Sequence, residues 1–248
     1  MSIAHPAQFV NGAWAAEPVK LRIRDLLLSA LTVSSGAIDA ISFLALGKVF
    51  SAFMTGNIAF LGLRVAGATA PGAVAIFTSM LSFAVGVYVS TRIVNRSTDG
   101  LWPARVTVAL GVSLIAHAAF VAIWFASGGH PSGNIAHVLL GLWALAMGIQ
   151  SAAVRTLHVE GIFTTAATAT VILFVSDISN WSTTIAERRR FVSILISLFI
   201  GATLGSLLLV RAPIYAPILP FAMTAAVVAT AMIVFNRSGD AAGGRIGE

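Results

Sequence analysis

One stretch of the sequence, residues 35–62, places polar and charged groups inside a segment apolar enough for a lipid bilayer. It contains the carboxylate of Asp39 and, further along, the triplet Thr55, Gly56 and Asn57. Charge at the centre of a bilayer costs roughly 2.5 kcal/mol or more, so an acid at that depth indicates a functional site by default. The short side chain of Asp39 cannot reach the membrane surface, so the carboxylate must be protonated, paired or hydrated.

The composition of the whole chain is that of a polytopic membrane protein. Of its 248 residues, 58% are hydrophobic and 10% are charged, whereas soluble domains carry roughly 25% charged residues. A net charge of +6 would suit a nucleic-acid partner only if the basic residues formed one stripe with aromatics between them. Here the basic residues lie between apolar runs, so they indicate which loops face the cytoplasm. The expected partner is the lipid bilayer. The absence of cysteine excludes a disulfide framework and a thiolate metal site.

Eight apolar segments follow one another, and each approaches the roughly 20 residues that a helix needs to cross about 30 Å of hydrocarbon. Alternating strand patterns, which a β-barrel requires, are absent. We therefore predict an all-α polytopic membrane protein with one membrane domain over residues 25–235, a cytoplasmic tail over 1–24 and a disordered tail over 236–248. The eight segments are 25–47, 49–68, 72–94, 104–126, 133–155, 161–180, 191–210 and 216–235.

The distribution of basic residues favours six crossings over eight. With a cytoplasmic N-terminus and eight crossings, nine of the 15 basic residues would lie inside. If segments 49–68 and 161–180 dip into the membrane and return, twelve lie inside, which fits the positive-inside rule better. We therefore predict about six transmembrane helices plus two re-entrant or broken segments, with Arg96 and Arg189 both cytoplasmic. Eight crossings remain the alternative.

A weak internal repeat singles out the same two segments. Residues 50–57 align with 163–170 at an offset of 113, and residues 36–40 align with 148–152 at an offset of 112. Further on, residues 83–86 resemble 198–201 at an offset of 115. The repeat divides the domain into halves, 25–127 and 133–235, which are inverted in the six-crossing topology and parallel in the eight-crossing one. Inverted repeats with interrupted segments near the midplane are a transporter architecture.

Hydroxyl and amide side chains in the paired segments predict a polar path through the membrane. They offer donors and acceptors to a small polar solute or a partly dehydrated ion. Serine and threonine in transmembrane helices also bond to their own helix or lie at close helix contacts, and this structural alternative stays open. The residues that we assign to the path are Asp39, Thr55, Gly56, Asn57, Gln150, Thr165, Thr168 and Thr170.

Other ionisable residues fall nearer the segment ends. Arg64 and Arg155 close their segments, where either can snorkel to the surface, neutralise a carboxylate or steer an anion. Asp177 suits a helix terminus, and the run 187–190 suits an orientation signal that touches anionic lipid. His117 lies inside a segment and is a candidate proton-relay group, although a histidine bonded to a neighbouring helix is the commoner case.

Signatures of enzymes and cofactor sites are missing. The sequence has no glycine-rich phosphate loop, no HExxH, no GxSxG and no pair of acids spaced for general acid and base catalysis. We therefore expect neither an enzyme, nor a cofactor, nor a metal site.

Several motifs of the first half carry a family resemblance. They are Gly36-Ala37-Ile38-Asp39-Ala40, Phe43-Leu44, Leu46-Gly47, Phe50, Met54-Thr55-Gly56-Asn57 and Leu61-Gly62. In the second half, residues 148–153 and 164–165 extend the likeness, with Ser151 where an Asn is common and Ala169 where a Gly is common. Over roughly residues 25–235 the chain resembles the YoaK family. The resemblance implies a multi-pass protein of the bacterial inner membrane with about six spans, and it implies no activity because that family lacks an assigned substrate.

Two classes of function remain open. The leading one is a secondary transporter or channel-like permease for a small polar solute or ion, with Asp39 as a coupling or gating acid. The alternative is a non-transporting membrane protein, either a partner subunit or a lipid-interacting scaffold, in which the same polar residues hold helices together. A membrane enzyme comes third. The sequence does not decide the substrate, the coupling ion or the oligomeric state, and a homo-oligomer stays open.

Overall fold

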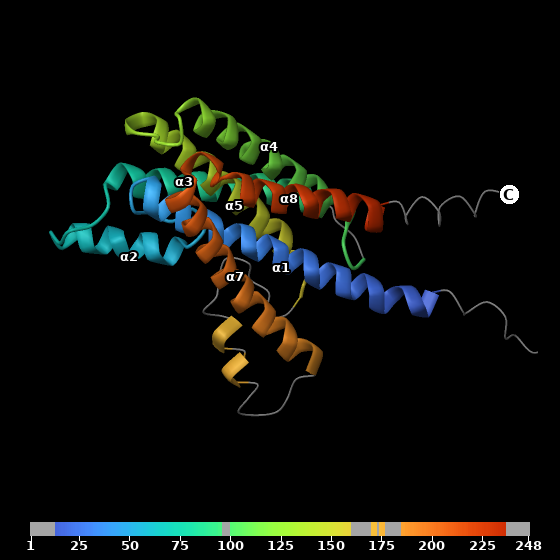
Figure 1. Ribbon diagram of the computed structural model, residues 1–248. Helices are drawn as coiled ribbons and strands as arrows, with labels where there is room; N and C mark the ends of the chain where they lie inside the picture. The colour runs from blue at the N-terminus through green and yellow to red at the C-terminus, as the bar shows by residue number, and fades with distance from the viewer. Residues whose placement is uncertain (1–12, 96–99, 160–169, 173, 177–184, 237–248) are drawn as a thin grey trace, which may run out of the picture.

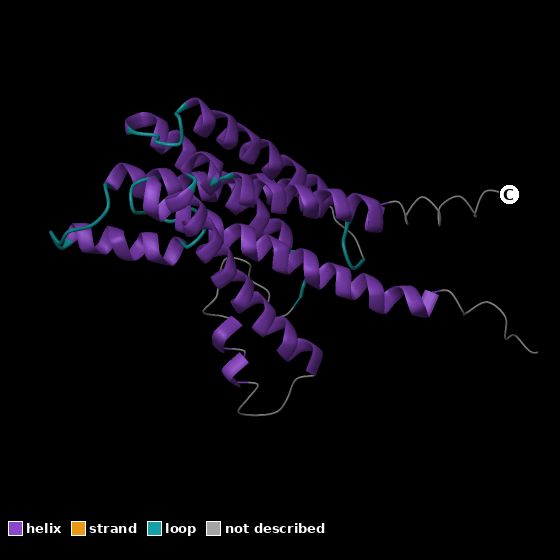
Figure 2. Ribbon diagram, in the orientation of Figure 1, coloured by secondary structure: helices purple, strands orange, loops and turns teal. Residues whose placement is uncertain are grey.

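The protein is built from helices. The computed structural model describes residues 13–95, 100–159, 170–172, 174–176 and 185–236, and this part of the chain contains no strand (Figures 1 and 2). The 3-10 turn Pro213–Tyr215 leads into the last helix and the π-helical turn Met232–Asn236 extends it. The α-helices whose bounds lie within the described residues are α1 (Ala13–Ala45), α2 (Met54–Val65), α3 (Ala73–Val94), α4 (Ala104–Ala126), α5 (Gly133–Arg155), α7 (Ile185–Arg211) and α8 (Ile218–Ala231). Residues 170–172 and 174–176 are helical as well.

Six helices among the described residues are long and apolar enough to cross a membrane. This confirms the predicted all-α membrane architecture, and six of the eight predicted segments correspond to these spans. Segment 49–68 contains only α2, whose 12 residues reach about 18 Å and so cover part of the roughly 30 Å hydrocarbon core. Most of segment 161–180 lies outside the described residues. The six spans are Pro18–Ala45, Ala73–Val94, Ala104–Ala126, Gly133–Arg155, Arg188–Arg211 and Pro213–Phe235.

The pairing of α1 with α7 depends on glycine. A methyl group added at Gly36 would overlap the carbonyl oxygen of Leu198, and one added at Gly201 would overlap that of Val33. Four residues further along α7, Gly205 lies against Ala37, and a Cβ added to this glycine would come within 2.7 Å of the Ala37 Cα. Residues later in α1 contact residues later in α7, so the two helices run parallel. Small residues spaced four apart allow this backbone approach in lipid.

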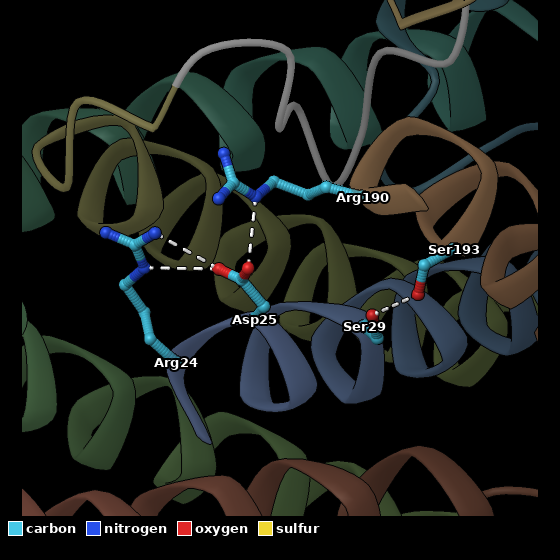
Figure 3. Close-up of polar contacts among 5 residues, drawn as sticks. All are labelled: Arg24, Asp25, Ser29, Arg190 and Ser193. Carbon is cyan, nitrogen blue, oxygen red and sulfur yellow. Dashed lines mark hydrogen bonds and ion pairs between the residues drawn. The ribbon is translucent and has the colours of Figure 1, made fainter. Parts of the chain in front are cut away.

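Polar groups fasten the same helix pair near its N-terminal end, as Figure 3 shows. The Oγ atoms of Ser29 and Ser193 lie 2.8 Å apart in a hydrogen bond. Asp25 accepts from Arg190 through Oδ2 and from Arg24 through Oδ1, each at 3.1 Å. One carboxylate between two guanidinium groups therefore links α1 to α7.

The pairing of α3 with α5 repeats the glycine arrangement. A Cβ on Gly86 would overlap the carbonyl oxygen of Leu145, and a Cβ on Gly148 would overlap that of Phe83. Earlier on both helices, the Cβ position of Gly141 lies 3.2 Å from the Ser82 Oγ. The contacts again advance together, so α3 and α5 also run parallel.

The remaining neighbours are antiparallel. The ring of Phe120 on α4 stacks on that of Trp143 on α5 at 3.5 Å between centroids, and the two helices are joined by the short stretch 127–132. In that connection Gly128 and Gly129 adopt positive φ angles of 65° and 80°, which glycine tolerates.

The orientation of α4 against α8 follows from contacts at both of its ends. Just before its start, Trp102 stacks on Phe235 at 5.7 Å, and near its end the Trp124 Nε1 donates to the Pro213 oxygen at 3.1 Å. The start of α4 thus lies beside the end of α8, and the end of α4 lies beside the start of α8, so the two helices are antiparallel. A short connection at residues 212–217 turns the chain from α7 into α8, as Figure 1 shows.

Buried side chains form two apolar clusters with polar residues between them. One cluster includes Leu31 and Leu110, and the other includes Ile38, Phe120 and Trp143. Between these levels lies a set of fully buried polar side chains that we call the central polar layer. Its members are Ser34, Ser35, Ser113, His117, Gln150 and Thr224.

Replacing Gly36 with alanine should destabilise the protein. The added methyl group meets backbone, which cannot move aside as a side chain can, so α1 and α7 must separate. We expect the free energy of unfolding in detergent to fall by about 1–3 kcal/mol. The matched control is Gly111→Ala in α4, where nothing lies within 4 Å of the added methyl. If both variants were equally stable, the close contact would not exist.

Candidate functional site

The first candidate site surrounds the loop of residues 46–53 between α1 and α2. Asp39, which is half-buried on α1, accepts hydrogen bonds through Oδ1 from the Ser51 N–H at 2.8 Å and the Ala52 N–H at 2.7 Å. The Ser42 and Ser51 hydroxyl groups bond to each other at 2.7 Å. Non-helical backbone at membrane depth needs such partners, because water is absent there. Asp39 therefore anchors the loop to α1.

Asn57 holds the same loop from the other side. Its Oδ1 accepts from the Phe50 N–H at 3.0 Å, and its Nδ2 donates to the Phe50 oxygen at 2.7 Å. Ser79 on α3 completes the network, since its hydroxyl accepts from Asn57 Nδ2 at 3.1 Å and donates to the Phe50 oxygen at 2.6 Å. Asn57 is fully buried. Its side-chain amide makes the same two hydrogen bonds with the Phe50 backbone that a residue of a neighbouring β-strand would make. We call Asp39, Asn57 and Ser79 the loop clamp.

The other two members of the polar triplet do not join the clamp. Thr55 is exposed on the surface of α2. Gly56 lies inside α2, and a Cβ there would come within 2.6 Å of the Phe53 ring, so its role is close packing. The triplet lies inside α2, and the non-helical part of the chain precedes it, at 46–53, where Asp39 and Asn57 satisfy the backbone.

Aromatic rings cover the clamped loop. Phe50 stacks on Phe43 and on Phe60, with ring centroids 5.1 and 5.9 Å apart. The ammonium group of Lys48 lies 5.3 Å from the Phe43 ring centroid, within the range of a cation–π interaction. These rings exclude lipid from one side of the loop.

Gln150 belongs to the central polar layer and not to the loop clamp. Its Nε2 donates to the Leu31 oxygen of α1 at 3.3 Å, whereas its Oε1 has no hydrogen-bond partner among the described residues. Leu31 precedes Asp39 by eight residues, or about 12 Å of helix. The described side chains therefore do not bring Gln150 and Asp39 into one contact cluster. Thr170 is fully buried, and Thr165 and Thr168 lie outside the described residues, so the shared path stays a prediction.

His117 is the second ionisable group buried inside a span. It lies in a buried stripe of α4 with Ser113, Phe120 and Trp124, and neither ring nitrogen has a hydrogen-bond partner in the part of the chain that the structure describes. The expected bond to a neighbouring helix is thus not made by any described helix. The Trp143 Nε1, on the ring that stacks on Phe120, also lacks a partner there.

The arginines that we considered as partners of Asp39 lie elsewhere. Arg64 is exposed and donates to the Pro71 oxygen at 3.1 Å, and Arg155 is exposed at the end of α5. Sequence reasoning missed the ion pair between Asp25 and Arg190. The two residues are 165 positions apart, and only their similar places at the starts of two segments hinted at it.

Two surface hollows bordered by described residues lie away from the loop clamp. One, of about 570 Å³, follows the outer face of α7 from Phe199 to Arg211. The other, of about 300 Å³, lies between the end of α1 and the connection of α4 to α5, beside His130. Asp39 borders neither of them. Within the described ranges, no group of three or more acids or histidines is placed to hold a metal ion.

Asp39→Ala should weaken the loop clamp more than Asp39→Asn does. Alanine leaves two backbone N–H groups without an acceptor, at about 1–3 kcal/mol each, whereas an asparagine oxygen still accepts without the charge. Chemical unfolding in detergent should rank stability as wild type, then Asp39→Asn, then Asp39→Ala. The control Thr55→Ala, at an exposed position, should unfold like wild type. Equal stability of all four proteins would remove the anchoring role.

Comparisons with known proteins agree with this architecture. The family model described as "Protein of unknown function (DUF1275)" matches residues 27–231. The UPF0700 transmembrane protein YoaK of Bacillus subtilis (strain 168) is 35% identical over 157 residues, which cover 63% of this chain and 68% of the relative. No solved structure matches. With six membrane-capable helices among its described residues, the chain is a multi-pass membrane protein that belongs to the DUF1275 family, as its resemblance to YoaK proteins indicated.

Proposed function

We propose that this protein is a secondary transporter or channel-like permease for a small polar solute or ion. In this proposal six helices cross the bacterial inner membrane, the N-terminus is cytoplasmic, and the halves 25–127 and 133–235 form an inverted repeat. The observation that carries it is the exchange of partners between the halves. Gly36 of the first half packs on α7 of the second, and Gly148 of the second half packs on α3 of the first.

The sequence offsets support the same symmetry. Gly36 aligns with Gly148, and Gly86 aligns with Gly201, and these four glycines make the tightest contacts of the two helix pairs. In the repeat, α1 corresponds to α5 and α7 corresponds to α3. The contact between α1 and α7 therefore corresponds to the contact between α5 and α3. The contacts of α4 with α5 and of α1 with α8 are related in the same way. Repeats whose interface holds the site are a common transporter plan.

Helix directions support an inverted relation. Because α4 runs antiparallel to both α5 and α8, and α7 turns back into α8, α5 and α7 run in opposite directions. Because α1 is parallel to α7 and α3 is parallel to α5, α1 and α3 also run in opposite directions. The stretches 46–72 and 156–184 then each begin and end at the same end of the bundle. That pattern is expected of re-entrant segments and not of additional spans.

The loop clamp gives the proposal a gate. The carboxyl group of Asp39 holds two N–H groups of the 46–53 loop. In the ionised form these hydrogen bonds are charge-assisted, which makes them roughly twice as strong as neutral ones. Uptake of a proton by Asp39 weakens this hold and favours release of the loop. Asp39 is then a gating acid whose protonation couples loop movement to a proton gradient.

The alternative function is a non-transporting scaffold or partner subunit. One observation favours it: Asp39 and Asn57 direct their hydrogen bonds to backbone of their own chain, as residues that only hold a fold do. In that case the same glycines and polar groups serve packing alone.

Cysteine labelling tests the topology that this function needs. Because the chain contains no cysteine, single replacements at Arg96 and His130 can be probed in intact cells with an impermeant thiol reagent. With six crossings, His130→Cys is labelled from outside and Arg96→Cys is protected. Eight crossings predict the reverse pattern, and that result would end the inverted-repeat proposal. Arg189→Cys, exposed at the start of α7, should be protected as well.

Transport in proteoliposomes tests the function itself. We expect the purified protein to accumulate at least one small polar metabolite from a mixture when a proton gradient is imposed. Asp39→Asn keeps the shape of the side chain and removes its titration, so it should abolish gradient-driven accumulation while the protein still inserts. Accumulation that is unchanged in Asp39→Asn would reduce Asp39 to a structural residue, and the absence of any transported compound would favour the scaffold.

A further inference from the structure

The central polar layer and its neighbour Trp143 contain polar atoms that no described protein group satisfies. Among the buried side-chain atoms of the described residues, six lack a hydrogen-bond partner, and five of these lie in or beside the layer. The sixth, the Ser90 Oγ, lies near the end of α3. Such atoms are rare in folded proteins, and their concentration in one place calls for water or a ligand. The five are Ser35 Oγ, His117 Nδ1, His117 Nε2, Trp143 Nε1 and Gln150 Oε1.

Helix register brings these atoms to neighbouring levels. The stacked rings of Phe120 and Trp143 align antiparallel α4 and α5. His117 lies three residues before Phe120, and Gln150 lies seven residues after Trp143, on the stripes of the two helices that face each other. The rise is about 1.5 Å per residue, so along the helix axes His117 lies between the levels of Trp143 and Gln150. It is roughly 4.5 Å from the level of Trp143 and roughly 6 Å from that of Gln150.

Helices α1 and α8 close the layer. Gln150 donates to the Leu31 oxygen, and Ser35 follows Leu31 by one turn on the same face of α1. The neighbouring Ser34 hydroxyl lies 3.2 Å from both the Pro220 oxygen and the Thr224 Oγ1 of α8. Four helices therefore surround the unpartnered atoms, and an apolar cluster lies on either side along the membrane normal.

The free groups include donors as well as acceptors. The Trp143 N–H is a donor, the Gln150 Oε1 is an acceptor, and a neutral imidazole and a hydroxyl group each supply both. The other charged groups on α1, α4, α5 and α8 lie away from this level. On α1, Lys20 to Asp25 lie ten or more residues before Ser35, which is about 15 Å or more along the helix. Arg105, His137 and Arg155 lie near helix ends, and Asp39, one turn beyond Ser35, is bonded to the loop. The layer thus suits a neutral molecule.

We propose that the central polar layer binds a small uncharged solute that both donates and accepts hydrogen bonds, such as a primary amide. His117, Trp143 and Gln150 contact the solute, and Ser35 borders it. This inference rests on the transport proposal and deepens it, since it places a solute site near the middle of the bilayer, between the two halves. Its test measures binding and needs no transport.

Hydrogen–deuterium exchange at the imidazole C2 position of His117 reports on the layer in the intact protein. We expect His117 in lipid nanodiscs to exchange, although more slowly than the exposed His130. Acetamide is the probe, and acetate, of similar size but charged, is its control. At the concentration that half-fills the site, acetamide should slow exchange at His117 about twofold, and acetate should not.

Two tryptophan variants locate the effect of acetamide. Trp143→Phe keeps the ring that stacks on Phe120 and removes the free N–H, so protection of His117 by acetamide should be lost. Trp102→Phe is the matched control, because the Trp102 Nε1 already donates to Thr107 at 3.0 Å, outside the layer. This control variant should keep the protection.

Two other outcomes of the exchange experiment overturn the inference. If His117 does not exchange during the time in which His130 exchanges fully, the layer is sealed and dry. If His117 exchanges but acetamide has no effect on it, the layer holds water alone. Protection by acetamide in a protein that transports nothing would support this site and contradict the transport proposal, so the two failures can be told apart.

Discussion

The structure depends on close backbone contact between helices at glycine. Within lipid, helices gain little from hydrophobic burial against each other, and their association rests on van der Waals packing and hydrogen bonds. At Gly36, Gly201, Gly86 and Gly148 a single methyl group would overlap a carbonyl oxygen of the facing helix. These contacts fix two parallel pairs, α1 with α7 and α3 with α5. The ion pair of Asp25 with Arg190 adds to the first.

The polar residues act within this frame in two places that lie about one helix turn apart on α1, at Ser35 and at Asp39. The loop clamp satisfies its own groups, since Asp39 and Asn57 bond to the backbone of residues 46–53. The central polar layer does not, since His117 and Gln150 keep atoms without a partner among the described residues. The satisfied cluster is suited to hold a conformation, and the unsatisfied one is suited to bind. Both tasks are needed in a permease, and only the first is needed in a scaffold.

Much of the fold could be predicted from the sequence, because apolar length determines spans and glycine can be seen in the pattern. The repeat aligned Gly36 with Gly148, but it did not reveal that both glycines are positions of close helix contact or which helices they meet. The partners of Asp39 could not be predicted, since they are backbone N–H groups whose positions depend on how the loop folds. The unpartnered setting of His117 was equally hidden, because register between α4 and α5 is set by the stacked rings of Phe120 and Trp143.

Disulfide cross-linking in the naturally cysteine-free chain tests the pairing of the halves most directly. The hydroxyl oxygens of Ser29 and Ser193 lie 2.8 Å apart, so cysteines at both positions need little movement to reach disulfide geometry. The account predicts rapid cross-linking of Ser29→Cys with Ser193→Cys under mild oxidation, and none of Ser29→Cys with Ser206→Cys. Cross-linking of the second pair without the first would contradict a parallel contact between α1 and α7, and with it the exchange of partners between the two halves.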